Sequence, residues 1–195
     1  MPEYVLFPRS RVLLPGQRLR LRVHDAHLSS RLAEVDEFCA VFTHNEPSRV
    51  GVVARVVARS AASFDRLDLE VIGGARLRLY TDARPAAATV EGELLAEEVG
   101  DRDVGLLRSE LQRGVRRFAA AAVESGRSGS LFSSLNADPT IASYQAATIL
   151  PISHPERQEL LEIETTTLRL EQELRIVAGE TGILRHLLGL GRMAT

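Results

Sequence analysis

The sequence predicts an α+β protein, with a barrel-like antiparallel sheet of about six strands and one short helix, followed by a helical bundle. Two observations predict this class. Apolar residues recur every second position in several segments before residue 100, which is the period of a half-buried strand, and every third or fourth position after it, which is the period of a helix. The change of period at Gly100 predicts two parts, residues 1–100 and 101–195.

The opening stretch contains two predicted strands. The first runs from Tyr4 to Phe7 and is closed by Pro8, whose missing N–H favours a strand end or a sheet edge. The second runs from Arg18 to Val23, where arginines alternate with apolar residues. Its apolar side chains therefore share one face and its arginines the other.

Further strands are predicted at 38–42, 50–57, 67–71, 76–79 and 89–99 from β-branched, apolar or alternating residues. Gly73-Gly74 predicts a hairpin or a bulged bend between two of them. A diglycine can also cradle phosphate, but such a site needs a helix directly after it, and here a strand follows.

A short helix is predicted after Asp25, with Leu28 and Leu32 on its buried face. The alternative is a metal site made of His24, Asp25 and His27. A helix cap is the favoured interpretation, because structural metal sites take four ligands and no companion cluster of Cys or His occurs in the sequence.

Three helices are predicted in the second half. The first follows a cap at Asp101 or Asp103 and runs for about five turns. The second starts at Asp138-Pro139 and runs to about 150. The third is a long acidic helix from about 160 that ends near Gly179 or Gly182, with a short piece at 183–188 after it.

Composition excludes several kinds of chemistry. All 24 basic residues are arginine, so the chain has no lysine for a P-loop, a Ser-Lys dyad or a Schiff base. The net charge of −2 excludes a basic nucleic-acid module by composition alone. The single Cys39 lies in an apolar run and is expected to be buried. Without a signal peptide or a transmembrane segment, the protein is expected to be soluble and cytoplasmic, with no contact with membranes.

Three stretches, taken together and in order, resemble the N-terminal substrate-recognition domain of Lon proteases, and more closely its standalone relatives. They are 5–23, with its opening strand, proline loop and second strand; 51–54 with 69–79, with its glycines and arginines; and 136–162, with Asn136-Ala137-Asp138-Pro139, Tyr144-Gln145-Ala146-Ala147 and Arg157-Gln158-Glu159-Leu160-Leu161. The resemblance covers nearly the whole chain and implies a PUA-like pseudo-barrel followed by a helical bundle.

The resemblance also implies a function, which is recognition of exposed or tagged polypeptide segments, or of a partner protein, without catalysis. Because the sequence ends at Thr195, no ATPase or protease domain is expected, and a protease acting in trans is a possible partner. No cofactor and no metal are expected. Four loop side chains are candidate peptide contacts: Leu13, Leu14, Leu131 and Phe132. The alternative for each of them is packing against the barrel ends.

The second functional hypothesis is RNA association, because PUA-like barrels elsewhere bind RNA. It requires a basic face formed by Arg18, Arg20, Arg22, Arg76 and Arg78. Aromatic residues that could stack on bases make up only 5% of the chain, so nucleic acid is the less favoured partner. An enzyme is less favoured still, because no catalytic motif is present.

Overall fold

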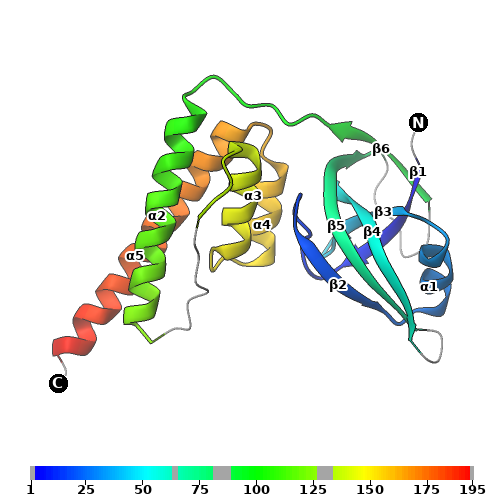
Figure 1. The fold of residues 1–195 in the computed structure, drawn as a ribbon, viewed down its shortest axis with the longest axis horizontal. Coiled ribbons are helices and arrows are strands. Elements are labelled where there is room, and N and C mark those ends of the chain that lie inside the picture. Colours follow the sequence, from blue (N-terminus) through cyan, green and yellow to red (C-terminus); the bar gives the residue numbers. More distant parts are fainter. Residues whose placement is uncertain (1–2, 63–65, 81–88, 127–133, 194–195) are drawn as a thin grey trace. The chain divides into compact units, whose positions relative to one another are not determined.

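A computed structural model describes residues 3–62, 66–80, 89–126 and 134–193 and confirms the predicted α+β class (Figure 1). The chain divides into two compact units. The first consists of Met1–Ala96 with Ser153–Glu162, and the second of Glu97–Ile152 with Ile163–Thr195. The first unit is therefore discontinuous in sequence. The predicted first part, residues 1–100, does not contain residues 153–162.

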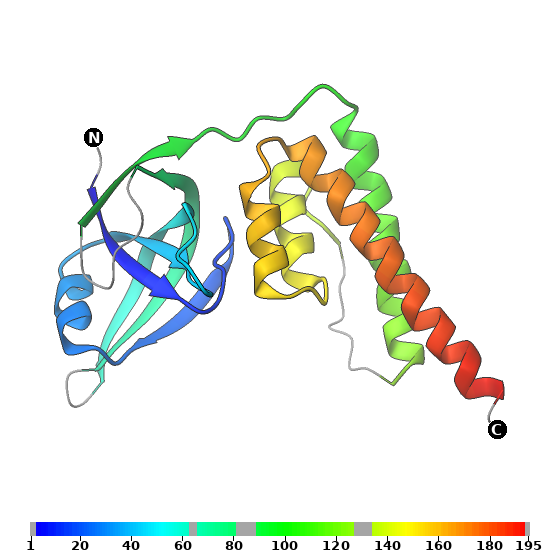
Figure 2. The same cartoon turned by 180° about the vertical axis from the view of Figure 1, so that it is seen from behind.

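The first unit is a barrel in which the strands β1 to β6 take part. Their bounds are β1 Glu3–Arg9, β2 Arg18–Val23, β3 Glu37–Phe42, β4 Val50–Ala62, β5 Arg66–Leu79 and β6 Thr89–Leu95. The order is β2-β5-β4-β3-β1-β6, and β5 also pairs with β6, so five strands close a ring and β2 extends it alongside β5. Figures 1 and 2 show these strands curving round a common interior, with helix α1 (Ala26–Ala33) beside them.

One strand pair departs from the predicted antiparallel sheet. β1 and β3 are parallel, with Leu6 opposite Cys39. Parallel neighbours need a long crossover, and the chain between them supplies one that includes β2 and α1. The cap of α1 is as predicted, because Asp25 Oδ1 accepts a hydrogen bond from the Leu28 amide at 2.7 Å.

Gly73 and Gly74 form a bulged bend within β5 rather than a hairpin between two strands. The register against β4 shifts between Val52 and Ala54 at this place. A Cβ atom on Gly74 would lie 2.8 Å from the Val53 carbonyl oxygen, so only glycine allows the two strands to come this close. The bend lets the first part of β5 pair with β2 and the last part with β6.

The barrel interior is filled by aliphatic side chains and by Cys39, which is fully buried as predicted. Burial raises the pKa of the Cys39 thiol to about 12, so the thiol stays protonated and unreactive. In β2 the predicted alternation is confirmed, since Leu21 and Val23 are buried and the intervening arginines are exposed.

Helix α4 (His154–Glu162) belongs to the first unit and is held there by two long-range hydrogen bonds. Gln158 Nε2 donates to the Val50 carbonyl oxygen at 2.9 Å. Arg76 Nη1 donates to the Leu161 carbonyl oxygen at 3.0 Å, at the end of α4. Because this contact covers Arg76, only 1% of that residue is exposed.

The second unit contains α2 (Val104–Glu124), α3 (Pro139–Ile149) and α5 (Thr166–Met193). The predicted caps form at Asp103, which accepts from the Leu106 amide, and at Asp138, which accepts from the Thr140 and Ile141 amides. α2 and α5 lie side by side in both ribbon views (Figures 1 and 2). The sequence predicts these helices but not how closely α2 and α5 pack together.

The predicted long helix from residue 160 is wrong in two respects. It is interrupted between α4 and α5, where the Thr165 hydroxyl accepts the Leu168 amide at 3.3 Å and so caps a new helix. In addition, α5 continues through Gly179 and Gly182, because neither glycine takes the left-handed conformation that ends helices.

A buried polar network joins the helices of the second unit. Arg169, which is fully buried, donates from Nε to Ser143 Oγ at 2.6 Å and from Nη2 to Glu97 Oε2 at 3.2 Å, and its guanidinium lies 4.0 Å from the centroid of the Tyr144 ring. Ser143 donates in turn to Glu173 Oε1 at 3.2 Å. Burial raises the pKa of Glu173 well above its usual value, against the opposing effects of Arg169 and Ser143.

Candidate functional site

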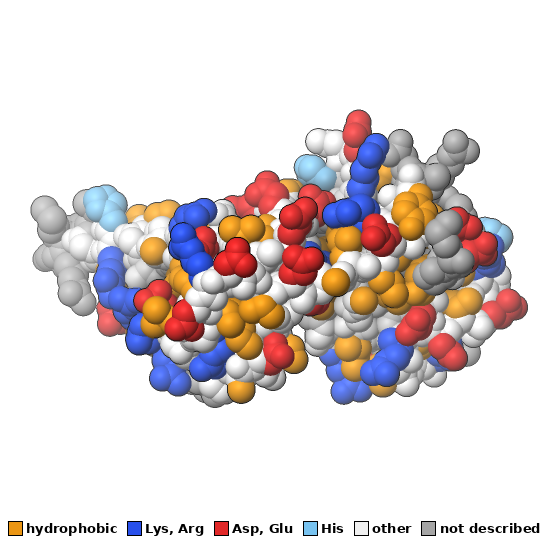
Figure 3. Space-filling model, turned by 90° about the horizontal axis from the view of Figure 1, so that it is seen from above, with side chains coloured by type: hydrophobic (Ala, Val, Ile, Leu, Met, Phe, Trp, Pro, Cys, Tyr) orange, Lys and Arg blue, Asp and Glu red, His pale blue; other side chains and the backbone are white. Residues whose placement is uncertain are grey.

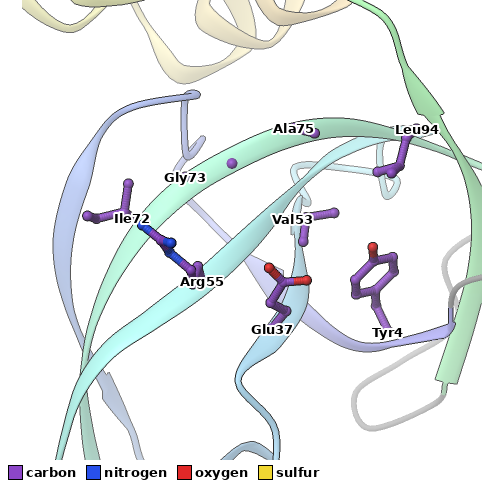
Figure 4. A pocket seen from close by; sticks show the side chains of 9 residues that line it. Tyr4, Glu37, Val53, Arg55, Ile72, Gly73, Ala75 and Leu94 are labelled. Carbon is purple, nitrogen blue, oxygen red and sulfur yellow. The ribbon is translucent and has the colours of Figure 1, made fainter.

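A pocket of about 320 Å³ opens at one end of the barrel, and we name this pocket the barrel mouth (Figure 4). Five strands meet here: β1 and β3 begin, β6 ends, and β4 and β5 pass through. The lining residues are Tyr4, Glu37, Val53, Arg55, Ile72, Gly73, Gly74, Ala75 and Leu94. The ends of small barrels are common places for ligands, because strands deliver side chains there from several directions.

The floor of the barrel mouth is continuous with the barrel core. Val53 is 5% exposed and belongs to the core cluster, and Tyr4 packs against the same cluster. Leu94 stands at the rim with 49% of its surface exposed. An apolar side chain entering the pocket would therefore meet an apolar floor and an exposed aliphatic rim.

The glycine wall of the barrel mouth is supported from behind by the loop between β1 and β2. Gly73 donates its amide to the Gln17 carbonyl oxygen at 2.9 Å and accepts the Gly16 amide at 2.8 Å. A Cβ atom on Gly73 would lie 2.2 Å from the Leu14 carbonyl oxygen. A side chain at this position would displace the loop, and so the wall is built from backbone.

The charged part of the rim comes from neighbouring strands. Glu37 on β3 lies opposite Arg55 on β4 in the strand register. Figure 4 shows both charged side chains on the same side of the pocket. The pKa of Tyr4 is raised by burial, then by the negative charge of Glu37, then by Cys39, so the phenol remains a neutral hydrogen-bond donor.

The polar side chains of the barrel mouth are those of Tyr4, Glu37 and Arg55. The lining contains no serine, cysteine or histidine, which are the usual nucleophiles and proton carriers. Within the ranges that the structure describes, no group of three or more His, Cys, Asp or Glu residues is placed to hold a metal ion. In those same ranges no helix combines the length and apolarity that a bilayer crossing requires.

The predicted peptide contacts do not line the barrel mouth. Leu13 and Leu14 are 3% and 0% exposed, so they cannot touch a bound peptide where they lie. Their observed position agrees with the packing alternative, because they fill the space behind Gly73. Leu131 and Phe132 lie outside the described residues.

The predicted basic face is divided by the structure. Arg18, Arg20, Arg22 and Arg78 are exposed, but Arg76 is buried, so the expectation of five surface arginines is wrong at that residue. Two of the exposed arginines face carboxylates on β5: Arg18 Nε lies 2.8 Å from Glu70 Oε1, and Arg22 Nε lies 3.9 Å from Asp68 Oδ1. Figure 3 likewise shows acidic and basic side chains interspersed over the face in view.

Sequence reasoning missed the residues of the barrel mouth. One signal was available, since Arg55 is a charged residue within the otherwise apolar run 50–57, and a charge in such a run indicates a place where the strand meets solvent. For Glu37 and Leu94 no local signal exists. These two residues line the same pocket because the strands that carry them are brought together when β5 pairs with β6 and closes the barrel.

Comparisons with known proteins agree on one family. The model of the ATP-dependent protease La (LON) substrate-binding domain matches residues 3–179. No curated protein sequence matches the chain. Among solved structures, a Lon N-terminal domain protein from Xanthomonas campestris is 21% identical, with a TM-score of 0.63, over 90% of this chain and 98% of that one. The N-terminal domain of the Mycobacterium avium complex Lon protease is 17% identical, with a TM-score of 0.67, over 91% and 98%.

Proposed function

The chain belongs to the family of Lon substrate-binding domains, and we propose that it is a non-catalytic module that binds exposed apolar segments of other polypeptides at the barrel mouth. The observation that carries this proposal is the continuity of the pocket floor with the core at Val53 and Tyr4. A folded protein buries its own apolar side chains, whereas an unfolded segment presents them, so an open apolar pocket selects the unfolded segment.

The size and the rim of the pocket support this class of ligand. A volume of about 320 Å³ accommodates a large side chain together with part of its backbone. The phenol of Tyr4 and the charges of Glu37 and Arg55 offer hydrogen bonds to peptide groups beside that side chain. Specificity would then come from size and apolarity rather than from a fixed sequence.

A fluorescence-anisotropy titration tests the proposal with a labelled peptide of alternating leucine and serine, beside a version in which serine replaces every leucine. The wild type is expected to bind the leucine peptide more tightly. Leu94→Asp should weaken that binding about tenfold or more, because a carboxylate at the rim loses water when the peptide docks.

Val57→Asp is the matched control, since Val57 is a similarly exposed aliphatic residue (44%) on a strand and does not line the pocket. Equal binding of the leucine peptide by Leu94→Asp and Val57→Asp would place the site elsewhere. Failure of the wild type to prefer leucine over serine would overturn the proposed function itself.

A further inference from the structure

A groove of about 270 Å³ is formed by helices α2 and α5 of the second unit, and we name it the helix groove. These two helices lie side by side in Figures 1 and 2. The residues that line the groove include Gly114 and Arg117 on α2, and Val177, Ala178, Gly182 and Arg185 on α5. Positions 178, 182 and 185 are four and three residues apart, so they share one face of α5.

The helix groove is open because glycines stand where larger side chains would fill it. Gly114 lets the two helices approach closely, since a Cβ atom on it would lie 2.8 Å from Val177 Cγ1. On α5, a Cβ atom on Gly182 would meet no atom within 4 Å, so the space beside this residue is empty of protein. The helix groove therefore has room for a side chain from another molecule.

The floor of the helix groove is apolar. Gly114 and Val177 are buried in the packing of α2 against α5, and Leu174 contributes a half-buried aliphatic side chain. The one hydroxyl in the lining, that of Thr181, donates to the Val177 carbonyl oxygen at 2.6 Å and so is satisfied within its own helix. An aliphatic side chain that enters the groove would bury apolar surface without displacing a polar partner.

The charged side chains of the lining are both basic, one from each helix: Arg117 and Arg185. Both are exposed, and in the part of the chain that the structure describes neither forms an ion pair with a carboxylate. Arg117 donates from Nε to the Arg113 carbonyl oxygen at 3.4 Å, and this bond leaves the positive charge uncompensated. By contrast, Arg175 lies outside the groove and has Glu171 Oε2 4.0 Å from its Nη2.

We propose that the helix groove binds a polypeptide segment in which an apolar side chain stands between two carboxylates. The apolar side chain would occupy the space beside Gly182, and the carboxylates would pair with Arg117 and Arg185 through charge-assisted hydrogen bonds. An inorganic anion would leave the apolar floor unused, and a wholly apolar segment would leave both arginines without an anion. The helix groove would bind such a segment whether or not the barrel mouth binds uncharged ones.

The test is a fluorescence-anisotropy titration of the whole chain with a labelled serine-rich peptide that contains one aspartate-leucine-glutamate triplet. Two reference peptides carry asparagine-leucine-glutamine or aspartate-serine-glutamate in its place. The triplet peptide is expected to bind about tenfold more tightly than either reference. If either reference peptide binds as tightly as the triplet peptide, the proposal is overturned, because it requires the carboxylates and the apolar side chain together.

Gly182→Leu locates the binding within the groove. The new side chain fills the open space and should weaken binding of the triplet peptide about tenfold. Leucine favours a helix more than glycine does, so the variant should fold, which circular dichroism would verify. Gly179→Leu is the matched control, because a Cβ atom there also meets no atom within 4 Å but Gly179 does not line the groove. Equal binding by the two variants would overturn the proposal.

The charged contacts are tested by substitution of each arginine. Arg117→Gln and Arg185→Gln should each weaken binding of the triplet peptide about tenfold, which is the loss of one charge-assisted contact. Arg175→Gln makes the same change of charge outside the groove and should bind like the wild type. Leu94→Asp should also bind the triplet peptide normally, so failure at the barrel mouth is distinguishable from failure here. If Arg117→Gln and Arg185→Gln bind as tightly as Arg175→Gln, the proposal is overturned.

A second copy of this chain is the other occupant that the test must separate. Sedimentation velocity without peptide would compare the wild type with Gly182→Leu. The two are expected to sediment alike, because the groove is proposed to be empty until a segment of another polypeptide binds. Self-association of the wild type that Gly182→Leu abolishes would assign the groove to a second copy and overturn the proposal.

Discussion

The two units bury arginine in different ways. In the barrel unit, Arg76 is satisfied by backbone carbonyl oxygens, those of Leu161 and Ala96. In the helical unit, Arg169 is held by the Glu97 carboxylate, the Ser143 hydroxyl and the Tyr144 ring. The network of the helical unit also contains the buried Glu173 carboxylate, whose pKa is raised by burial, so the stability of that unit should depend on pH through this group.

The largest effect is expected for Arg169→Met. Removing this fully buried guanidinium deletes its hydrogen bond to Ser143, its ion pair with the partly exposed Glu97 and its contact with the Tyr144 ring, at a combined cost of about 3–5 kcal/mol in the free energy of unfolding. Hydrogen exchange followed by mass spectrometry would measure it segment by segment. Faster exchange is expected in α3 and α5, with no change in β3 and β4. A uniform loss of protection in both units would show that Arg169 does not stabilise the helical unit specifically.

Arg76→Met should destabilise the barrel unit by about 2–3 kcal/mol, because the buried Leu161 carbonyl oxygen and the partly buried Ala96 carbonyl oxygen lose a charged donor. The same hydrogen-exchange experiment should show faster exchange in β5 and α4. Arg78→Met is the control, because Arg78 lies two residues further along β5 and is exposed. If both variants behave alike, the contacts of Arg76 do not stabilise the barrel.

Glu173→Gln should reveal the pH dependence of the helical unit. Because the folded-state pKa of Glu173 is raised, its contribution to stability is complete below the unfolded-state value near 4.5 and is lost as pH rises toward the folded-state pKa. The variant should thus match the wild type near pH 4.5 and be more stable at pH 7.5, by about 1.4 kcal/mol for each pKa unit of the shift within that window.

Urea unfolding at the two pH values measures this difference. If the free energies of unfolding of Glu173→Gln and the wild type differ by the same amount at both pH values, Glu173 does not titrate in the folded chain.

The smallest effect is expected at the surface of the barrel unit. Arg18→Gln removes the exposed pair with Glu70, and the free energy of unfolding should change by less than about 0.5 kcal/mol. Thermal unfolding at low and high salt would measure it. A larger loss would mean that β2 depends on its charges and not only on buried Leu21 and Val23.

Features that depend on neighbouring residues could be predicted from the sequence. Asp25, Asp103 and Asp138 cap helices because a carboxylate three residues from an amide needs no distant partner. The alternation of β2 placed its faces correctly for the same reason.

Features that depend on distant segments could not be predicted. Arg76 continues an arginine-leucine alternation and looks solvated in sequence, but it is covered by the end of α4, 85 residues away. The barrel mouth is of the same kind, because its lining comes from five strands that meet only when the ring closes.

The return of α4 to the barrel affects the order in which the chain folds during synthesis. When β6 has left the ribosome, the Gln158 side chain that will donate to Val50 and the carbonyl that will accept from Arg76 do not yet exist. The barrel therefore stays incomplete while α2 and α3 leave the ribosome. It can be completed only after residue 162 has left the ribosome. A fragment ending at residue 100 should consequently behave as an incomplete barrel, open to proteases at β5 until a peptide of residues 153–162 is added.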